Sequence, residues 1–119
     1  EAMDGLEGFS HIMVLYWPHL KTEASRQTLQ VHPMGCKDIP QKGVFATCSP
    51  ARPNPVLIST VPLIRRDERL LKVRGLDALD GSPILDIKPF VQMAHGADNP
   101  TRPDWMIRLH RELEEDTGQ

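Results

Sequence analysis

Apolar residues are concentrated in a few short segments of the chain. Residues 11–17 form a nearly continuous apolar run of residues that favour strands, and Pro18 ends it. Because this run is apolar on both faces, it predicts a strand that is covered on both sides. Residues 57–64 predict a further strand, in which Pro62 indicates an edge position or a bulge. Residues 70–74 alternate between apolar and basic, which predicts a hairpin with a charged turn over 65–69.

Two more short strands and one helix complete the predicted elements. Residues 42–47 and 84–89 predict the strands, whereas 21–41, 49–55 and 77–83 are rich in polar residues, Pro and Gly and predict loops. After a linker over 96–103, apolar residues recur every four positions at Trp105, Leu109 and Leu113, with Asp104 as the N-cap. Short strands at regular spacing favour a barrel or a sandwich. We therefore predict a mainly β fold, a small antiparallel β-barrel with a C-terminal helix.

Composition narrows the class of protein. A chain of 119 residues suits one domain. No stretch of about 18 apolar residues exists, so we expect no membrane span. Two cysteines and the absence of a secretory signal favour a cytoplasmic protein over a disulfide scaffold. The chain opens at Glu1 without an initiator Met, which indicates a processed or partly missing N-terminus.

Charge is unevenly distributed along the chain. The net charge is −2, but residues 21–74 carry ten Lys or Arg and four Asp or Glu. A basic middle with acidic ends is suited to a polyanion on one face. A solvated surface with charges of both signs is the alternative interpretation. Arg65, Arg66 and Arg69 are the candidate contacts to nucleic acid.

Two segments have the chemistry of a binding site. Three prolines in residues 50–55 fix a loop that presents Arg52 and Asn54, so little entropy is lost when it binds a ligand. The turn at 77–82 places Asp77 and Asp80 three residues apart beside Gly81, where carboxylates can hold a hydroxyl, an amine or a cation. Both segments also have a purely structural interpretation, as loops that close one end of the fold.

Other kinds of site have weaker support. His19, His32, Cys36 and Cys48 are suitable zinc ligands, but their spacing matches no standard zinc site and we expect no metal. A nucleophile elbow, a phosphate-binding loop and a dinucleotide fingerprint are all missing from the sequence.

Three blocks of the sequence resemble a known family. They are Gly5-Leu-Glu-Gly-Phe-Ser-His-Ile12, Val44-Phe-Ala-Thr-Cys-Ser-Pro-Ala-Arg-Pro-Asn-Pro55 and Gly75-Leu-Asp-Ala-Leu-Asp-Gly-Ser-Pro-Ile-Leu-Asp-Ile-Lys-Pro89. Their order and spacing are similar to those of the TrmO family, also called TsaA-like or YaeB-like. The resemblance covers roughly residues 5–90, which predicts a family domain over 1–96, with its N-terminal part missing, and a linker and helix over 97–119.

The resemblance implies a β-barrel, a homodimer and an S-adenosyl-L-methionine-dependent methyltransferase. The implied substrate is the threonylcarbamoyl-adenosine next to the tRNA anticodon, methylated at N6. The implied cofactor-binding residues are His19, Leu20, Cys48, Ile58, Asp77, Leu79, Asp80, Gly81 and Ser82. Arg52, Asn54, Arg65, Arg66 and Arg69 are the expected substrate-binding residues, and His19 is the candidate catalytic base.

The family usually has Arg where this chain has Cys48, and this departure leaves other functions open. One is a divergent, non-catalytic module that binds a small ligand or a partner. Another is a methyltransferase with a different acceptor. A third is a regulatory protein that a zinc ion stabilises through Cys36 and Cys48.

Overall fold

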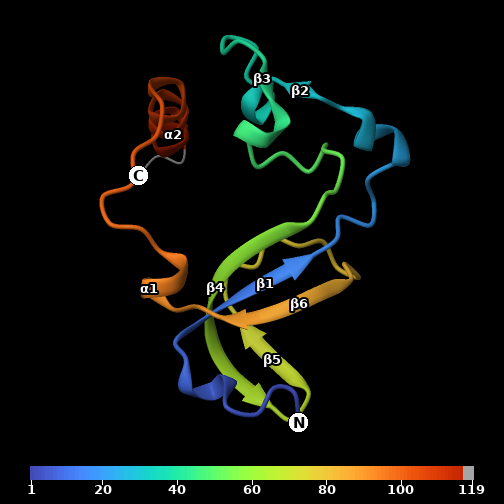
Figure 1. Ribbon diagram of the computed structural model, residues 1–119, viewed down its shortest axis with the longest axis vertical. Coiled ribbons are helices and arrows are strands. Elements are labelled where there is room, and N and C mark those ends of the chain that lie inside the picture. Colours follow the sequence, from blue (N-terminus) through green and yellow to red (C-terminus); the bar gives the residue numbers. More distant parts are fainter. Residues whose placement is uncertain (117–119) are drawn as a thin grey trace.

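The computed structural model describes the backbone of residues 1–116 and the side chains of residues 1–114. Its centre is an antiparallel sheet in the order β5–β4–β1–β6. The strands are β1 (His11–Tyr16), β4 (Leu57–Asp67), β5 (Leu70–Val73) and β6 (Ile84–Pro89). Figure 1 shows this sheet in the lower half of the molecule, with β2 and β3 above it. The four strands were all predicted, with shifts in their ends.

Strand β1 forms the core of the sheet because its side chains after His11 are apolar. Ile12, Val14 and Tyr16 are buried and pack with Val61 of β4. The alternate residues Met13 and Leu15 are half-buried. The predicted cover on both sides is therefore complete on one face of β1 and partial on the other.

Strand β4 is longer and more central than predicted. It continues to Asp67, so the predicted turn over 65–69 is wrong, and the hairpin turn consists of Glu68 and Arg69 only. An edge position for Pro62 is also wrong, since β4 pairs with β1 on one side and β5 on the other. The predicted irregularity is present, because the register of the β4–β5 pair shifts between Leu63 and Arg65.

The segment between β1 and β4 is more structured than the predicted loop. Over 21–41 it contains the 3-10 helices η2 (Glu23–Gln27) and η3 (Pro33–Gly35) and strand β2 (Gln30–Val31). The predicted strand over 42–47 is wrong beyond its first two residues. Only β3 (Lys42–Gly43) pairs with β2, and the 3-10 helix η4 (Val44–Ala46) follows.

Two further short helices flank the sheet. The 3-10 helix η1 (Leu6–Gly8) precedes β1 and packs Leu6 against the core. Helix α1 (Gln92–His95), which was not predicted, follows β6 and is a single turn.

The predicted C-terminal helix is present as α2 (Asp104–Asp116). It lies beside β2 and β3 rather than on the sheet (Figure 1), and the ammonium of Lys42 sits 5.8 Å from the centroid of the Trp105 ring. Leu109 is buried, as its position in the four-residue spacing predicts. Within residues 1–116 no helix has the length and apolarity that a membrane crossing requires.

The predicted closed barrel is not confirmed. Across residues 1–116 the strands form one open sheet of four and a separate pair, and β5 and β6 remain as edges. The strand pattern predicts local pairing, but it contains no information about whether the first and last strands meet.

Candidate functional site

A pocket of about 900 Å³ lies where the end of β1, the start of β4 and two loops meet. Most of the predicted binding residues line it, although they are far apart in the sequence. The cofactor candidates in its wall are Leu20, Cys48, Ile58, Asp77, Leu79 and Ser82, and the substrate candidates there are Arg52 and Asn54.

The prolyl loop over 49–55 forms one wall and is held by its own side chains. The backbone N–H of Ser49 donates to Thr47 Oγ1 at 3.2 Å, and the N–H of Ala51 donates to Ser49 Oγ at 3.1 Å. The guanidinium of Arg52 donates to the carbonyls of Thr47 (2.8 Å) and Ser49 (3.2 Å). These internal hydrogen bonds support the prediction of a loop that is shaped before any ligand arrives.

Arg26 of η2 binds this loop through hydrogen bonds from its outer side. The sequence did not identify Arg26 as part of the site. Its Nε donates to the carbonyl of Pro53 at 2.6 Å, and its Nη2 donates to Asn54 Oδ1 at 3.1 Å. Its guanidinium also lies 5.7 Å from the centroid of the Trp17 ring. A lone Arg in a polar segment has no pattern that distinguishes it, so only the folded chain reveals this contact.

The turn over 79–82 forms the opposite part of the site. The backbone N–H and the hydroxyl of Ser82 both donate to the carbonyl of Leu79, at 3.0 and 2.6 Å. Gly81 has a φ of +86°, which the third position of this turn requires and which favours glycine. The phenol of Tyr16 donates to the carbonyl of Asp77 at 2.9 Å, which ties the turn to the end of β1.

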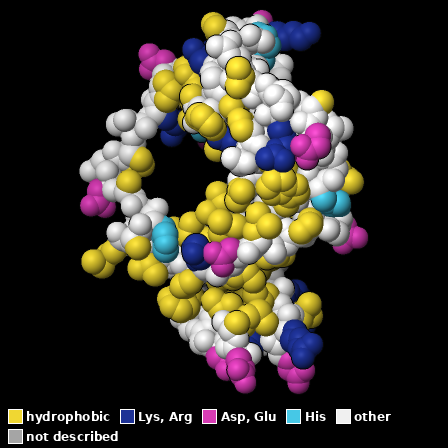
Figure 2. Space-filling view, turned by 45° about the vertical axis from the view of Figure 1, so that its right-hand side comes forward, with side chains coloured by type: hydrophobic (Ala, Val, Ile, Leu, Met, Phe, Trp, Pro, Cys, Tyr) yellow, Lys and Arg dark blue, Asp and Glu magenta, His cyan; other side chains and the backbone are white. Residues whose placement is uncertain are grey.

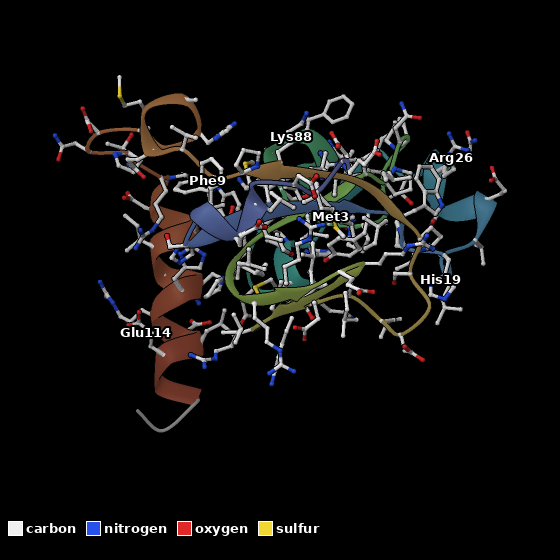
Figure 3. All side chains as sticks on the ribbon, turned by 90° about the horizontal axis from the view of Figure 1, so that it is seen from below. Met3, Phe9, His19, Arg26, Lys88 and Glu114 are labelled. Carbon is white, nitrogen blue, oxygen red and sulfur yellow. The ribbon has the colours of Figure 1, made fainter. Side chains whose placement is uncertain are left out.

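His19 and Asp80 are close to the pocket but are not part of its wall. The ring of His19 lies against Gly81, since a Cβ built there would be 3.6 Å from its Nε2. Asp80, the second residue of the turn, is exposed. Figure 3 shows His19 and Arg26 at the same end of the molecule, opposite the end where Glu114 lies on α2.

Exposed apolar side chains surround the pocket. Phe45 is 82% exposed and Leu20 is 69% exposed, and each lines the wall. The other exposed apolar residues of the wall are Val56, Ile58 and Leu79. Figure 2 shows hydrophobic side chains gathered across the middle of one face of the molecule. Asp77, Lys21 and Arg52 supply the charges, so the pocket suits a flat, partly apolar ligand with charged ends.

The arginines of the β4–β5 hairpin are not brought to this pocket. Arg65 pairs with Asp67 at 2.7 Å, and Arg66 pairs with Asp4 at 2.9 Å and with Glu7 at 3.4 Å. The hydrogen bond that Arg66 donates to the carboxylate of Asp4, aided by the one to Glu7, raises the pKa of Arg66 above its usual value. Arg69 is exposed in the hairpin turn. Neighbouring acids thus neutralise part of the predicted basic patch.

The part of the chain that the structure describes contains no set of ligands for the zinc ion of the alternative hypothesis. No three His, Cys, Asp or Glu side chains come together there as a metal site would need. The Nδ1–H of His32 donates to the carbonyl oxygen of Ile39 at 2.9 Å, and Cys36 and Cys48 are free thiols.

Residues 1–95 match the family described as the tRNA-methyltransferase O N-terminal domain. The chain belongs to this family. Its relatives include a probable S-adenosyl-L-methionine-binding protein of Methanothermobacter thermautotrophicus, 55% identical over 77% of this chain and 63% of that protein. Another is the tRNA (adenine(37)-N6)-methyltransferase of Escherichia coli, 39% identical over 79% of this chain and 41% of that protein.

Solved structures of the family have the same fold. The crystal structure of TrmO from Pseudomonas aeruginosa superimposes with a TM-score of 0.66 at 32% identity, over 87% of this chain and 41% of that one. The chain thus spans less than two thirds of the length of the curated relatives named above. The blocks that carry the resemblance lie within the matched residues, which confirms the family that the sequence predicted.

Proposed function

We propose that this chain is an S-adenosyl-L-methionine-dependent methyltransferase that modifies N6 of threonylcarbamoyl-adenosine in the tRNA anticodon loop. The observation that carries the proposal is the single pocket that gathers Leu20, Cys48, Ile58, Asp77 and Ser82 from four separate segments. Relatives named as S-adenosyl-L-methionine-binding proteins, and one named as a tRNA methyltransferase, support it.

The pocket fits the cofactor in size and in chemistry. Its volume of about 900 Å³ lies within the range of small-molecule sites. The exposed apolar side chains of Ile58 and Leu79 suit the faces of an adenine. The Asp77 carboxylate suits ribose hydroxyls or an ammonium, and Lys21 suits a carboxylate.

The cofactor supplies a methyl group that is already activated by a sulfonium. The protein therefore has to align the acceptor with that group and remove a proton from the acceptor nitrogen. His19 is the proposed base, because its ring lies against Gly81 of the turn that we propose binds the cofactor. The prolyl loop, fixed by Arg26 and Arg52, keeps its wall in place while the acceptor enters.

The tRNA and a second copy of the chain are the proposed partners. Phosphates dominate the affinity of proteins for RNA, so Arg52 and Arg69 are proposed to contribute through charge. Arg65 and Arg66 are proposed to contribute less, because acidic side chains pair with them. A homodimer is favoured by the open edge of β6, where Ile84 and Leu85 are each about half exposed (49% and 50%). Such an edge tends to pair with another chain.

Methyl transfer to tRNA tests the proposal directly. Purified protein is incubated with methyl-labelled S-adenosyl-L-methionine and tRNA that carries threonylcarbamoyl-adenosine, and the digested nucleosides are analysed by mass spectrometry. The labelled N6-methyl derivative is the expected product. With His19→Gln we expect a fall of about 100-fold or more in kcat, while the affinity for the cofactor changes little.

His110→Gln on α2 is the matched control, and we expect it to leave the rate unchanged. Cofactor binding without transfer to any nucleoside would contradict the proposed activity. It would favour the second candidate, a non-catalytic binding module. The observation in favour of that candidate is Cys48, which stands in the pocket wall where the resemblance leads us to expect Arg.

A further inference from the structure

Phe45 is a large aromatic side chain that folding leaves in water. It belongs to η4 and is 82% exposed, although burial of a Phe is strongly favourable. It also lines the pocket, and it precedes by two residues Thr47, whose hydroxyl and carbonyl support the prolyl loop. An exposed aromatic ring at a pocket wall is well placed to contact a ligand.

One face of the Phe45 ring already has a partner. The guanidinium carbon of Arg52 lies 5.7 Å from the ring centroid, a cation–π distance. Two backbone carbonyls, of Thr47 and Ser49, hold the Nη1 of Arg52 in this position. The exposed fraction of the ring leaves its other face open. The Arg52 half of the pair is therefore held in place before a ligand arrives, which lowers the conformational entropy that stacking on the pair costs.

The chemistry of this pair suits an unpaired nucleobase. Proteins recognise single-stranded RNA by stacking bases on aromatic rings and guanidinium planes. Among the described residues, the recorded hydrogen bonds of Arg52 use Nη1 only, so Nε and Nη2 are left for a phosphate. Lys21 adds a second cation to the same pocket wall. A base attached to a phosphate backbone satisfies both the ring and the cations.

We propose that Phe45, backed by Arg52, is the stacking platform that receives the methyl-acceptor purine after it leaves the stack of the RNA loop. The inference rests on the proposed function and names a substrate-positioning residue for it. Enzymes that act on a base take it out of the stack into a pocket. The platform belongs to η4 and the prolyl loop, whereas most residues proposed for the cofactor lie on β4 and the 77–82 turn.

A binding cycle tests the inference without relying on turnover. Phe45→Leu removes the ring and keeps an apolar side chain, and Phe45→Tyr restores a ring. Phe9→Leu is the matched control, since Phe9 is also exposed (39%) but lines a different cavity. Each full-length variant is titrated with two anticodon stem-loop RNAs, one with the acceptor purine and one abasic at that position. For each variant, calorimetry measures the affinity for S-adenosyl-L-methionine, and circular dichroism checks that the protein is folded.

With the intact RNA we expect Phe45→Leu to weaken binding by about 5- to 150-fold, the range for one stacked base. With the abasic RNA we expect the same variant to bind as the wild type does, because the lost partner is already absent. Phe45→Tyr and Phe9→Leu should bind both RNAs as the wild type does. The affinity for S-adenosyl-L-methionine and the dichroism spectrum should not change in any variant.

Three results would overturn the inference. An equal loss with both RNAs would assign the ring to another part of the RNA, and a loss of cofactor affinity would assign it to the cofactor. If the wild-type protein bound the cofactor but neither RNA, Phe45 could not be a platform for an RNA base. The chain would then be a methyltransferase with another kind of acceptor. This third result would also reject the tRNA substrate of the proposed function, whereas the first two leave that function intact. Absence of cofactor binding as well would reject methyl transfer altogether.

Discussion

Arg26 has the most connected side chain near the site. It joins η2 to the prolyl loop through Pro53 and Asn54 and stacks on Trp17 at the end of β1. Its side chain is 33% exposed, so water screens these contacts only in part. The loop thus owes its position to one guanidinium as well as to its prolines.

Arg26→Gln should therefore lower the free energy of unfolding by about 1 kcal/mol, because it removes charged hydrogen bonds to the loop. It should also weaken the binding of S-adenosyl-L-methionine, since the wall of the pocket loses its brace. Arg108→Gln on α2 is the control, as it removes only an exposed pair with Glu112. Urea unfolding and calorimetry measure both effects, and equal behaviour of the two variants would contradict the role of Arg26.

At the level of elements, α2 depends on one buried leucine. Leu109 is 7% exposed and Leu113 is 38% exposed, although both belong to the four-residue spacing of the helix. We expect Leu109→Ala to lower the free energy of unfolding by about 2 kcal/mol or more. Leu113→Ala should cost less than half as much. Thermal and urea unfolding provide the test, and similar losses would show that α2 is not packed as described.

The elements that the sequence predicted are those whose pattern is local. The apolar run of β1, the alternation at Leu71 and Val73, and the Asp-Gly turn at Gly81 each require only neighbouring residues. The end of β3 could not be predicted this way. After Gly43 the chain turns, because the N–H and the hydroxyl of Thr47 both bond to the carbonyl of Val44 instead of a strand partner.

The candidate site shows the same division. Asp77 and Arg52 were identified because turn and prolyl-loop chemistry is visible in the sequence. Arg26 and Phe45 were missed, since their importance comes from contacts with Pro53 and with the Arg52 guanidinium, which the sequence does not contain. Arg65 was identified by charge alone, and its pairing with Asp67 could not be foreseen.

Over the whole molecule the described chain is open. Its radius of gyration is 16.5 Å, whereas a compact domain of this length has about 13.5 Å. Figure 2 shows an opening between the arm that leads to α2 and the rest of the chain. Some surface ion pairs link segments that are far apart in sequence, as Arg66 links β4 to Asp4 and Glu7.

Acid should destabilise the fold through two carboxylates. The pKa of Glu7 lies below its usual value, because of backbone N–H bonds and, secondarily, Arg66. The pKa of Asp86 is lowered first by the hydrogen bond from Lys88 and then by the N–H of Ile87. Folding lowers the pKa of both carboxyl groups, so each one stabilises the folded state at neutral pH. This stabilisation is lost as the pH falls below about 4.

Urea midpoints between pH 7 and pH 3 measure this effect. Glu7→Gln and Asp86→Asn should each lower the midpoint at pH 7 and make its decline with acid shallower. Asp98→Asn, in the exposed linker over 96–103, should leave the whole curve unchanged. A curve for Asp86→Asn that keeps the full acid slope would contradict the assignment.

The most direct test of the account is a calorimetric titration of S-adenosyl-L-methionine into the wild-type chain, Asp77→Asn and Asp80→Asn. The two variants make the same change in one turn, but only Asp77 lines the pocket. We expect saturable one-to-one binding by the wild type, a loss of about tenfold or more for Asp77→Asn, and a much smaller loss for Asp80→Asn. No binding by a folded wild-type chain, or an equal loss in both variants, would contradict the claim that this pocket is the cofactor site.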